Sequence, residues 1–443
     1  MNNTIAAIAT PPGTGGVAIV RISGTDALSV AQKVSNLKDF QANTVKPCVF
    51  YAADGKTVLD RGLLSVFRAP HSYTGEDVAE LNCHGSYFLA QKLLTVVLQA
   101  GARLAEPGEF TKRAFLAGKL DLTQVEAVAD MISAGSDLSL KMALQHLEGD
   151  VCREIRSLRN DFLQILSGIE AALDYPEEIS DPQISEIQKK LESSSTQITT
   201  LLADSDKGLL MKTGATVVLV GKPNAGKSSL FNALLKYNKA IVSDLPGTTR
   251  DALEAEISLG GLKINLIDTA GLRETQDVLE KLGTERSQAH LQSADLVLAI
   301  FDAASGVTEE DQKILTLLQN RPHLCVINKI DLSEKMELAN SIQISAKTGQ
   351  NLDILIERVL ETLNLRHIDI NKTVYVSSLR QKNKLIQAAR SIEKCLSALK
   401  SVDFLDVLAP FLKEVIVTLG EITGDETSAE IIDNIFSTFC VGK

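Results

Sequence analysis

Residues 217–228 read Val-Val-Leu-Val-Gly-Lys-Pro-Asn-Ala-Gly-Lys-Ser. The four leading apolar residues predict a short buried strand, and Gly221–Ser228 match the pattern Gly-x-x-x-x-Gly-Lys-Ser. Glycines in this pattern let backbone N–H groups turn toward phosphate oxygens at the positive end of the following helix. Lys227 would reach the β- and γ-phosphates, and the Ser228 hydroxyl would bind Mg²⁺. The stretch therefore predicts a strand–loop–helix unit that binds a nucleoside triphosphate.

A second motif, Asp268-Thr269-Ala270-Gly271, follows the strand-like stretch Ile264–Ile267. Asp268 would hold Mg²⁺ through a water molecule, and the Gly271 amide would contact the γ-phosphate. Between the two motifs lies Gly247-Thr248-Thr249-Arg250-Asp251, in which Thr249 would supply a second hydroxyl to the Mg²⁺. These residues extend the first motif to a complete triphosphate site.

A third motif, Asn328-Lys329-Ile330-Asp331, follows another apolar strand at Leu324–Ile327. The Asp331 carboxylate can accept hydrogen bonds from both N1–H and the 2-amino group of guanine. Adenine would leave this acceptor unpaired, at a cost of about 1–3 kcal/mol when the acceptor is buried. Ser345-Ala346-Lys347 follows the last strand, where it would close over the base. The expected nucleotide is therefore GTP.

The expected GTP-binding residues lie in five short stretches of this part of the chain. They are Asn224, Ala225, Gly226, Lys227, Ser228, Ser229, Ser243, Asp244, Leu245, Pro246, Gly247, Thr248, Thr249, Asp268, Thr269, Ala270, Gly271, Asn328, Lys329, Asp331, Ser345, Ala346 and Lys347. Leu272 then stands where Ras-like enzymes have the glutamine that orients the attacking water. Hydrolysis must use another group, for which Glu274, Glu280 and Glu285 are candidates.

Hydrolysis also needs positive charge between the β- and γ-phosphates. Arg250 and Arg273 are two candidates for this charge. The alternative is a monovalent cation held by Asn224 and by carbonyl groups of residues 243–248, because hard cations take oxygen ligands. The spacing of these residues does not choose between an arginine and a cation.

Around the nucleotide motifs, the pattern of apolar residues changes three times along the chain. Residues 1–117 predict a small α/β domain, with strand-like stretches at Ile5–Ala9, Val17–Ile22, Cys48–Ala53, Leu63–Phe67 and Val78–Cys83. Residues 118–213 are helical, with an apolar stripe formed by Ile155, Leu158, Phe162, Ile165, Ile169 and Leu173. Residues 214–364 alternate strands with helices, as a parallel sheet requires, and residues 365–443 are helical again. The expected fold is therefore a nucleotide domain inserted into a helical domain, after an N-terminal α/β domain.

Composition limits the classes of function. The 443 residues include 45 Lys and Arg against 56 Asp and Glu, a net charge of −11, which excludes broad, sequence-blind coating of nucleic acid. Residues 372–400 are an exception, with seven basic residues and one acidic residue. This run could contact RNA phosphates, although a solvated helix face is the usual role of such a run. No apolar run is long enough to span a membrane, the N-terminus has no signal-peptide core, and the scattered cysteines suit a reducing cytoplasm.

Several further stretches resemble one family along essentially the whole chain. They are Ala9-Thr10-Pro11-Pro12-Gly13, Arg21-Ile22-Ser23-Gly24, Tyr73-Thr74-Gly75-Glu76-Asp77, Pro107-Gly108-Glu109-Phe110, Lys119-Leu120-Asp121-Leu122 and Phe439-Cys440-Val441-Gly442-Lys443. With the nucleotide motifs, they make the chain similar to the MnmE (TrmE) family of tRNA modification GTPases. The last stretch is the most specific, because ribosome-assembly GTPases with similar nucleotide domains lack it.

The resemblance implies a homodimer with an N-terminal folate-binding and dimerisation domain, a helical domain and an inserted G domain. It also implies an FAD-dependent partner, MnmG, in a heterotetramer that adds an aminomethyl or carboxymethylaminomethyl group at C5 of the wobble uridine of certain tRNAs. The added carbon comes from 5,10-methylene-tetrahydrofolate, and 5-formyl-tetrahydrofolate is a related ligand. A ribosome-assembly GTPase that performs no base chemistry is the alternative function.

The resemblance assigns roles to residues that match the family's motifs. Asn224, Ser243, Leu245 and Thr248 would ligate K⁺, and Glu280 would orient the water through an intervening contact. Arg21, Glu80, Lys119 and Lys443 would line the folate pocket. Cys440 has two possible roles: its thiol attacks C6 of uridine, or it is a small apolar plug at a helix end.

Overall fold

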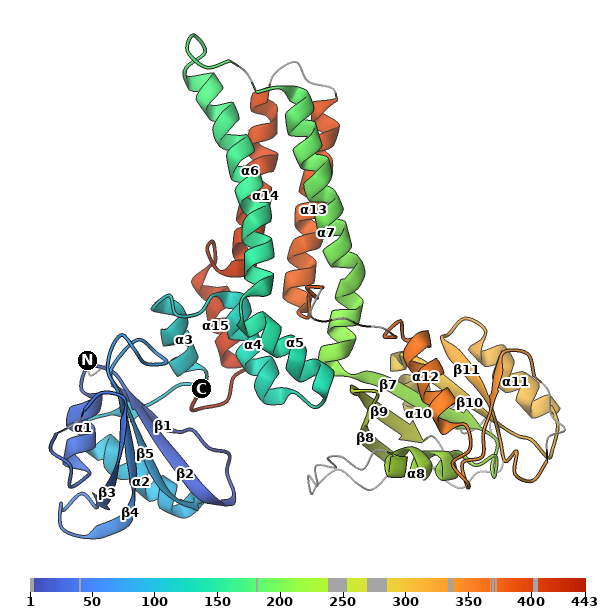
Figure 1. The fold of residues 1–443 in the computed structure, drawn as a ribbon, viewed down its shortest axis with the longest axis horizontal. Coiled ribbons are helices and arrows are strands. Elements are labelled where there is room, and N and C mark those ends of the chain that lie inside the picture. Colours follow the sequence, from blue (N-terminus) through green and yellow to red (C-terminus); the bar gives the residue numbers. More distant parts are fainter. Residues whose placement is uncertain are drawn as a thin grey trace. The chain divides into compact units, whose positions relative to one another are not determined.

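The computed structural model describes residues 4–39, 41–180, 182–237, 253–268, 285–333, 338–366, 368, 370, 373–400 and 405–443 (Figure 1). These residues form two compact units. Unit 1 comprises Met1–Ala129, Cys152–Asn160 and Ile416–Lys443, and unit 2 comprises Asp130–Val151 and Asp161–Val415. The N-terminal and C-terminal segments of the chain thus belong to the same unit.

Unit 1 is built on a six-stranded sheet with the strand order β3-β4-β5-β2-β1-β6. The strands are β1 (Ile5–Ile8), β2 (Thr14–Ser23), β3 (Thr44–Tyr51), β4 (Val58–Phe67), β5 (Val78–Ser86) and β6 (Arg103–Leu104). Its helices are α1 (Ala27–Lys33), α2 (Tyr87–Gln99), α3 (Glu109–Leu116), α15 (Ala429–Ser437) and most of α4 (Leu122–Ser133). The five expected strand stretches all lie within or overlap observed strands, and the two-residue β6 is an addition.

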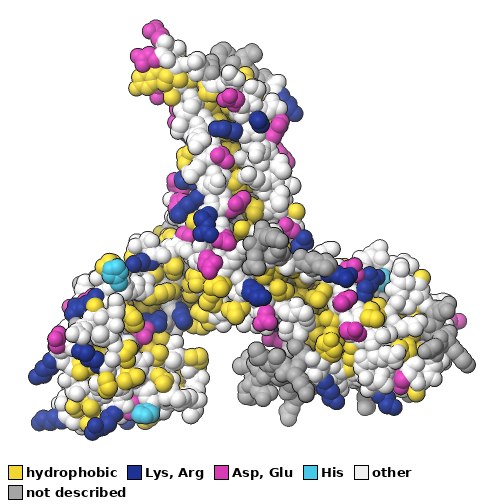
Figure 2. Space-filling view, viewed as in Figure 1, with side chains coloured by type: hydrophobic (Ala, Val, Ile, Leu, Met, Phe, Trp, Pro, Cys, Tyr) yellow, Lys and Arg dark blue, Asp and Glu magenta, His cyan; other side chains and the backbone are white. Residues whose placement is uncertain are grey.

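The two faces of this sheet have different environments. Apolar side chains of α1 and α2 pack on one face, in a core that contains Val20, Phe50 and Leu81. On the other face, Phe110 of α3 packs with Ile5 and Ala7 of β1. The β3–β4–β5 end of that face keeps large apolar side chains exposed, among them Val45 (59%) and Leu63 (45%). Figure 2 shows hydrophobic side chains interspersed with Lys and Arg over this unit.

Unit 2 contains the second sheet, with the strand order β12-β11-β10-β7-β9-β8. The strands are β7 (Ala215–Gly221), β8 (Leu253–Leu259), β9 (Leu262–Asp268), β10 (Leu296–Asp302), β11 (His323–Asn328) and β12 (Ser341–Gln343). Helices α8 (Lys227–Tyr237), α10 (Glu285–Ser293), α11 (Glu309–Leu318) and α12 (Leu352–Thr362) connect or follow them. The expectation of a parallel sheet is wrong at one edge, because β8 pairs antiparallel with β9 through a tight turn at Gly260 and Gly261.

The long helices are α5 (Asp137–Leu147), α6 (Asp150–Asp174), α7 (Ile184–Thr213), α13 (Leu379–Leu399) and α14 (Ala409–Thr423), with a 3₁₀ turn at Leu405–Leu408. Five of the six residues in the expected α6 stripe are buried. Leu173 is the exception and is 52% exposed, because it lies one residue before the end of α6. Within unit 2, α13 runs beside α7 (Figure 1), and an ion pair of 2.5 Å joins Lys382 to Asp206.

In unit 2, α5 is attached directly to the edge of the sheet. The Leu138 amide donates to the Gly261 carbonyl at 3.1 Å, at the tip of the β8–β9 turn. Met142 of α5 and Met211 of α7 belong to the same apolar core as Leu262 of β9. The nucleotide domain therefore shares a core with α5 and with the end of α7.

The expected succession of an α/β part, helices, a P-loop α/β part and helices is confirmed. Within the described residues, no helix is both long enough and apolar enough to cross a membrane. Part of the positive charge of the basic run at 372–400 is paired with acidic residues of the same chain. Lys382 pairs with Asp206, and Lys394 lies 3.5 Å from Glu414. These ion pairs reduce the positive charge that the run can offer to RNA.

Candidate functional site

The phosphate-binding motif forms the turn between β7 and α8. Asn224 has φ +65° and Gly226 has φ +96°, so two residues of the loop have the left-handed backbone conformation. A Cβ on Gly226 would lie 2.1 Å from Asn328 Nδ2, so only glycine fits this position. The loop thus leads into the first turn of α8, where free backbone N–H groups can bind an anion.

The polar residues of this motif point into the turn. The Lys227 side chain is 7% exposed, and its Nζ donates to the Gly221 and Lys222 carbonyls at 2.8 Å each. The Ser228 hydroxyl donates to Asp268 Oδ2 at 3.0 Å, and Asp268 is fully buried at the end of β9. A hydroxyl beside a carboxylate is a pair of hard oxygen ligands, which fits Mg²⁺.

Asn328 joins three segments of the site. Its side chain is 1% exposed, its Nδ2 donates to the Ala225 carbonyl at 3.1 Å, and its Oδ1 accepts from the Ala346 amide at 2.9 Å. Because β11 lies two strands from β7 in the sheet, this one side chain connects the phosphate loop with the base-binding side. The residues expected from three separate motifs are thereby brought together.

The base side of the site is formed by Asp331 and Ser345. The Ser345 hydroxyl is buried and donates to Asp331 Oδ1 at 2.7 Å, which orients the carboxylate and leaves Oδ2 for a ligand. Asp331 itself is exposed, as a group that receives a ligand must be. Lys347 and Ser229 are also exposed, and no contact of these two side chains defines a role.

Asp302, at the end of β10, is a site residue that the motifs do not indicate. Lys329 Nζ lies 2.7 Å from Asp302 Oδ2 and donates to the Asn224 carbonyl at 2.6 Å. Burial raises the pKa of Asp302, but the hydrogen bonds from Lys329 and the Ala304 amide outweigh it, so the pKa is lowered. The sequence offers one signal for this role. Asp302 follows an apolar run, as Asp268 and Asn328 do at the ends of their strands.

Several expected site residues lie outside the described residues. They are Ser243, Asp244, Leu245, Pro246, Gly247, Thr248, Thr249, Thr269, Ala270, Gly271, Glu280 and the alternative candidates Arg250, Arg273 and Glu274. Of the four expected K⁺ ligands, Asn224 alone is described, and it is exposed in the loop. The side chain of Glu285 is not described either.

A second group of expected residues meets on the sheet of unit 1. Arg21 and Glu80 are direct partners in the β2–β5 register, and Arg21 Nε lies 2.8 Å from Glu80 Oε1. Arg21 also donates to the Gly442 carbonyl at 3.4 Å and lies 5.7 Å from the centre of the Phe110 ring. Arg21, Glu80 and the C-terminal segment thus form one cluster at the end of the exposed sheet face.

The C-terminal segment 440–443 is held against α3 and β1. The Phe110 amide donates to the Lys443 oxygen at 3.2 Å, and the Gly108 amide donates to the Cys440 carbonyl at 3.5 Å. Gly442 has φ +99°, and a Cβ there would lie 2.3 Å from the Ile8 carbonyl oxygen. Any side chain at position 442 would clash with β1, so this arrangement of the C-terminal segment requires glycine there.

Two cationic side chains, Arg21 and Lys443, lie in this cluster with one carboxylate side chain, Glu80. Burial and the nearby Arg21 guanidinium lower the pKa of Lys443, although Glu80 acts in the opposite direction. An anionic ligand placed here would relieve this repulsion, whereas a cation would increase it. The residues present thus fit the carboxylates of a folate, and Glu80 offers an acceptor to a pterin edge.

Lys119 is placed differently from the other three expected folate residues. It is exposed just after α3, and its chain lies against the turn at Gly75, where a Cβ would be 3.6 Å from Lys119 Cε. No contact of Lys119 with Arg21, Glu80 or Lys443 is present among the described residues. Its assignment to the pocket depends on the resemblance alone.

Charged residues in the resembling stretches have a structural role that the sequence did not indicate. Arg113 pairs with Glu76 at 2.9 Å and with Glu109 at 2.9 Å. Glu109 is 8% exposed; burial raises its pKa, but hydrogen bonds from Arg103, the Glu106 amide and Arg113 lower it to about 2. This network fixes the start of α3, and hence Phe110, beneath the Arg21 cluster.

All six cysteines lie in the described residues, and Cys440 differs from the other five. The other five are buried, whereas Cys440 is exposed. Burial raises the pKa of Cys48 to about 11 and the pKa values of Cys152 and Cys395 to about 12, which keeps these thiols protonated and unreactive. An exposed Cys440 does not match the role of a buried apolar plug.

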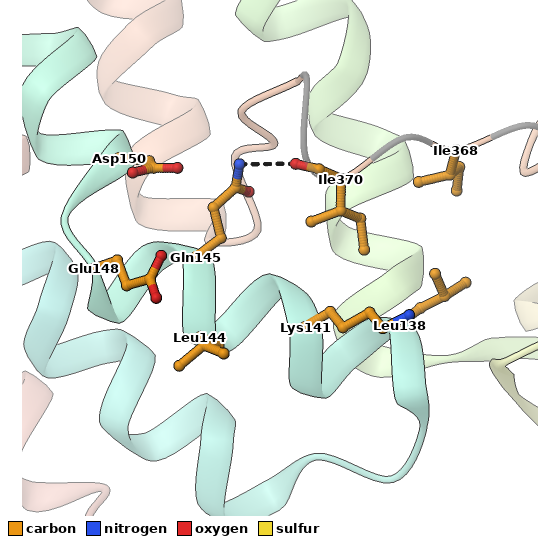
Figure 3. Close-up of a pocket in the computed structure, with 8 residues that line it drawn as sticks. All are labelled: Leu138, Lys141, Leu144, Gln145, Glu148, Asp150, Ile368 and Ile370. Carbon is orange, nitrogen blue, oxygen red and sulfur yellow. Dashed lines mark hydrogen bonds between the residues drawn. The ribbon is translucent and has the colours of Figure 1, made fainter.

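A cavity of about 460 Å³ lies elsewhere in unit 2, between α5 and the segment that follows α12 (Figure 3). Leu138, Lys141 and Gln145 of α5 line it, together with Ile368 and Ile370. Gln145 Nε2 donates to the Ile370 carbonyl at 2.8 Å, which holds this segment to α5. None of the residues that line the cavity belongs to either candidate site.

Comparison with known proteins covers the whole chain. The family model of the MnmE helical domain matches residues 122–440, and that of the TrmE N-terminus, described as a GTP-binding protein, matches residues 4–119. The tRNA modification GTPase MnmE of Carboxydothermus hydrogenoformans is 42% identical over 463 residues, covering 100% of both chains. Those of Desulforamulus reducens and Clostridioides difficile are each 39% identical, again over 100% of both chains.

Similarity to solved structures includes matches to a part of the chain. The G domain of the T. maritima FeoB iron transporter is 28% identical and covers 33% of this chain and 98% of that chain, with a TM-score of 0.26. The identification therefore rests on the full-length relatives and on the two family models. On that evidence, the chain belongs to the MnmE family of tRNA modification GTPases.

Proposed function

We propose that the chain binds and hydrolyses GTP and uses this cycle in the modification of tRNA. The observation that carries the proposal is the meeting of Lys227, Ser228, Asp268, Asn328 and Asp331 at the carboxyl edge of one sheet. Ligands of such α/β sheets bind outside the carboxyl ends of the strands. The names of the full-length relatives supply the link to tRNA modification.

In this proposal each expected residue of the nucleotide site has one task. Lys227 leaves the loop carbonyls to contact the β- and γ-phosphates, and Asp331, oriented by Ser345, accepts from the guanine edge. Ser228, Thr249 and, through water, Asp268 would hold Mg²⁺, which would supply positive charge to the phosphates. Asn224, Ser243, Leu245 and Thr248 would hold K⁺, and Glu280 would orient the water.

The chemistry on tRNA is the second part of the proposal. With the FAD-dependent partner MnmG, the chain would direct a one-carbon unit from 5,10-methylene-tetrahydrofolate to C5 of the wobble uridine. The two cationic side chains Arg21 and Lys443 support a folate with its carboxylates at this cluster. The exposed thiol of Cys440, two residues from Gly442, is available to the reacting base.

A homodimer is proposed from the surface of unit 1. The register places Val17, Val45 and Leu63 on the same sheet face as Arg21, and their side chains are 58%, 59% and 45% exposed. Large apolar side chains exposed together on one sheet face are typical of a protein–protein interface. A second copy of the chain would bury it.

Replacing Asp331 with Asn should exchange the preferred base. The variant presents an N–H to position 2 of the base, so we expect GTP affinity to fall about 100-fold and xanthosine triphosphate affinity to rise. Titration with fluorescent mant-GTP and competition with both nucleotides measures this. The exposed Asp353→Asn on α12 serves as the matched control. Unchanged GTP affinity in Asp331→Asn would contradict the assignment of the base-binding side.

Replacing K⁺ with Na⁺ at equal ionic strength should slow GTP turnover by about tenfold or more, while mant-GTP affinity changes little. The reason is that the smaller ion does not span the oxygen ligands expected around Asn224. Turnover in Rb⁺, which is close to K⁺ in size, should be intermediate, and choline provides the control without a coordinating cation. Equal turnover in all four salts would return the role to Arg250 or Arg273.

Two substitutions on one sheet face should separate folate binding from dimerisation. Arg21→Ala removes a charged hydrogen-bond donor, so we expect affinity for 5-formyl-tetrahydrofolate to fall about tenfold or more while the dimer persists. Leu63→Glu places a charge in the proposed interface and should yield monomers. Equilibrium dialysis and sedimentation velocity measure the two properties, with the exposed Lys56→Ala as the control. Wild-type folate binding in Arg21→Ala, or dimers in Leu63→Glu, would count against the respective part.

The full proposal is tested by mass spectrometry of tRNA nucleosides from cells that lack the chain. We expect C5-aminomethyl-type uridines to disappear and wild type to restore them, whereas Lys227→Ala and Cys440→Ser do not. Cys325→Ser, at a buried position in the sheet, is the control for Cys440→Ser. If these nucleosides never change, the part of the proposal that concerns the base is wrong. A ribosome-assembly GTPase then becomes the better explanation of the nucleotide site.

A further inference from the structure

Each oxygen of the Asp302 carboxylate has a partner within the protein. Oδ2 lies 2.7 Å from Lys329 Nζ, and Oδ1 accepts from the Ala304 amide at 2.9 Å. The second contact turns the chain at the end of β10 and fixes the direction of the carboxylate. The first holds one end of a long, flexible side chain that would otherwise sample many rotamers. Asp302 therefore determines where the Lys329 amine is found.

The same amine reaches the phosphate loop. Lys329 Nζ donates to the Asn224 carbonyl at 2.6 Å. Asn224 (φ +65°) and Lys329 (φ +68°) both have the left-handed backbone conformation that residues with side chains rarely adopt. A contact that joins these two residues thus stabilises the less favourable backbone at both ends. Without the carboxylate, the amine would exchange this carbonyl for water.

The neighbouring loop residues depend on the same strand end. Ala225 accepts from Asn328, and Gly226 lies so close to Asn328 that no Cβ fits between them. Residues 224–226 of the phosphate loop are therefore supported, one after another, by residues 328 and 329. Asp302 lies beneath this support and has no role among the residues expected to touch the nucleotide.

We infer that Asp302 is a positioning residue that couples the guanine-binding strand end to the phosphate loop through Lys329. The coupling makes the two ends of the nucleotide bind cooperatively, because a base that orders Lys329 also orders the loop at Asn224. This inference rests on the proposed binding of GTP and adds a residue to that site. Loss of the Asp302 carboxylate should therefore speed the release of nucleotide and leave the preference for guanine unchanged.

A simple structural ion pair would behave differently. The side chains of Lys329 and Asp302 are 29% and 20% exposed, and pairs of this kind contribute little to overall stability. If stability were the only role, Asp302→Ala would lower the melting temperature slightly and leave nucleotide release unchanged. Asp295, at the other end of β10, offers a matched comparison, since its Oδ2 accepts from the Thr216 amide at 2.8 Å.

The experiment measures dissociation of mant-GDP from the full chain by stopped flow. Asp302→Ala should release mant-GDP about tenfold faster, and Asp302→Asn, which keeps an acceptor but not the charge, by a smaller factor. The ratio of GTP to xanthosine triphosphate affinities should stay at the wild-type value in both. Asp295→Asn should release mant-GDP at the wild-type rate, which shows that damage to β10 alone does not explain the result.

A double-mutant cycle with Lys329→Ala identifies the route of the effect. In the Lys329→Ala background, Asp302→Ala should produce little further acceleration, because the residue it positions is gone. Equal acceleration in both backgrounds, or none in wild type, would overturn the inference while leaving GTP binding established. Wild-type binding of mant-GDP is measured first, and its absence would overturn the proposed function and this inference together.

Discussion

The buried side chain of Asn328 is the contact on which the nucleotide site depends. Its amide is 1% exposed, so both its donor and its acceptor must be satisfied inside the protein. It meets this requirement by donating to Ala225 and accepting from Ala346, which lie before α8 and after β12. A single unsatisfied atom here would cost about 1–3 kcal/mol. The phosphate loop, the base-binding strand end and the closing loop are therefore held in one arrangement by the need to pair one amide.

In unit 1, nearly buried charged side chains must likewise be paired, and their partners fix the local structure. Glu109 and Arg113 are nearly buried, and the ion pairs among them, Glu76 and Arg103 fix the start of α3. The ordered helix then offers its backbone N–H groups to the segment that contains Cys440 and Lys443. Residues that are hundreds of positions apart thus meet beside Arg21. Glu76 and Glu109, which lie in stretches that mark the family, belong to this support.

Most elements were predictable because their signals are local. Apolar runs followed by Asp268, Asn328 or a glycine loop identified the strands β7, β9 and β11 and the polar residues at their ends. The antiparallel β8 was missed, although Leu253–Leu259 alternates apolar with polar residues, a pattern typical of a half-buried strand. Leu173 followed the helical period but lies where α6 ends, so periodicity alone placed it in the core. The first error concerns a local hairpin, whose two strands are joined by Gly260 and Gly261, and the second arose where a helix ends.

The sequence by itself determined the nucleotide chemistry and the family, because Lys227, Asp268 and Asp331 each stand in a short motif whose residue types suit contacts with GTP. Only the tertiary structure decided which residues support these three. Asp302 and Ser345 act through partners 27 and 14 positions away, and no periodic pattern links such pairs. The physical reason is that a ligand imposes its own geometry on the residues that touch it, and this leaves a motif in the sequence. A supporting side chain needs only one partner within hydrogen-bond distance, which many sequences can supply and only the folded chain reveals.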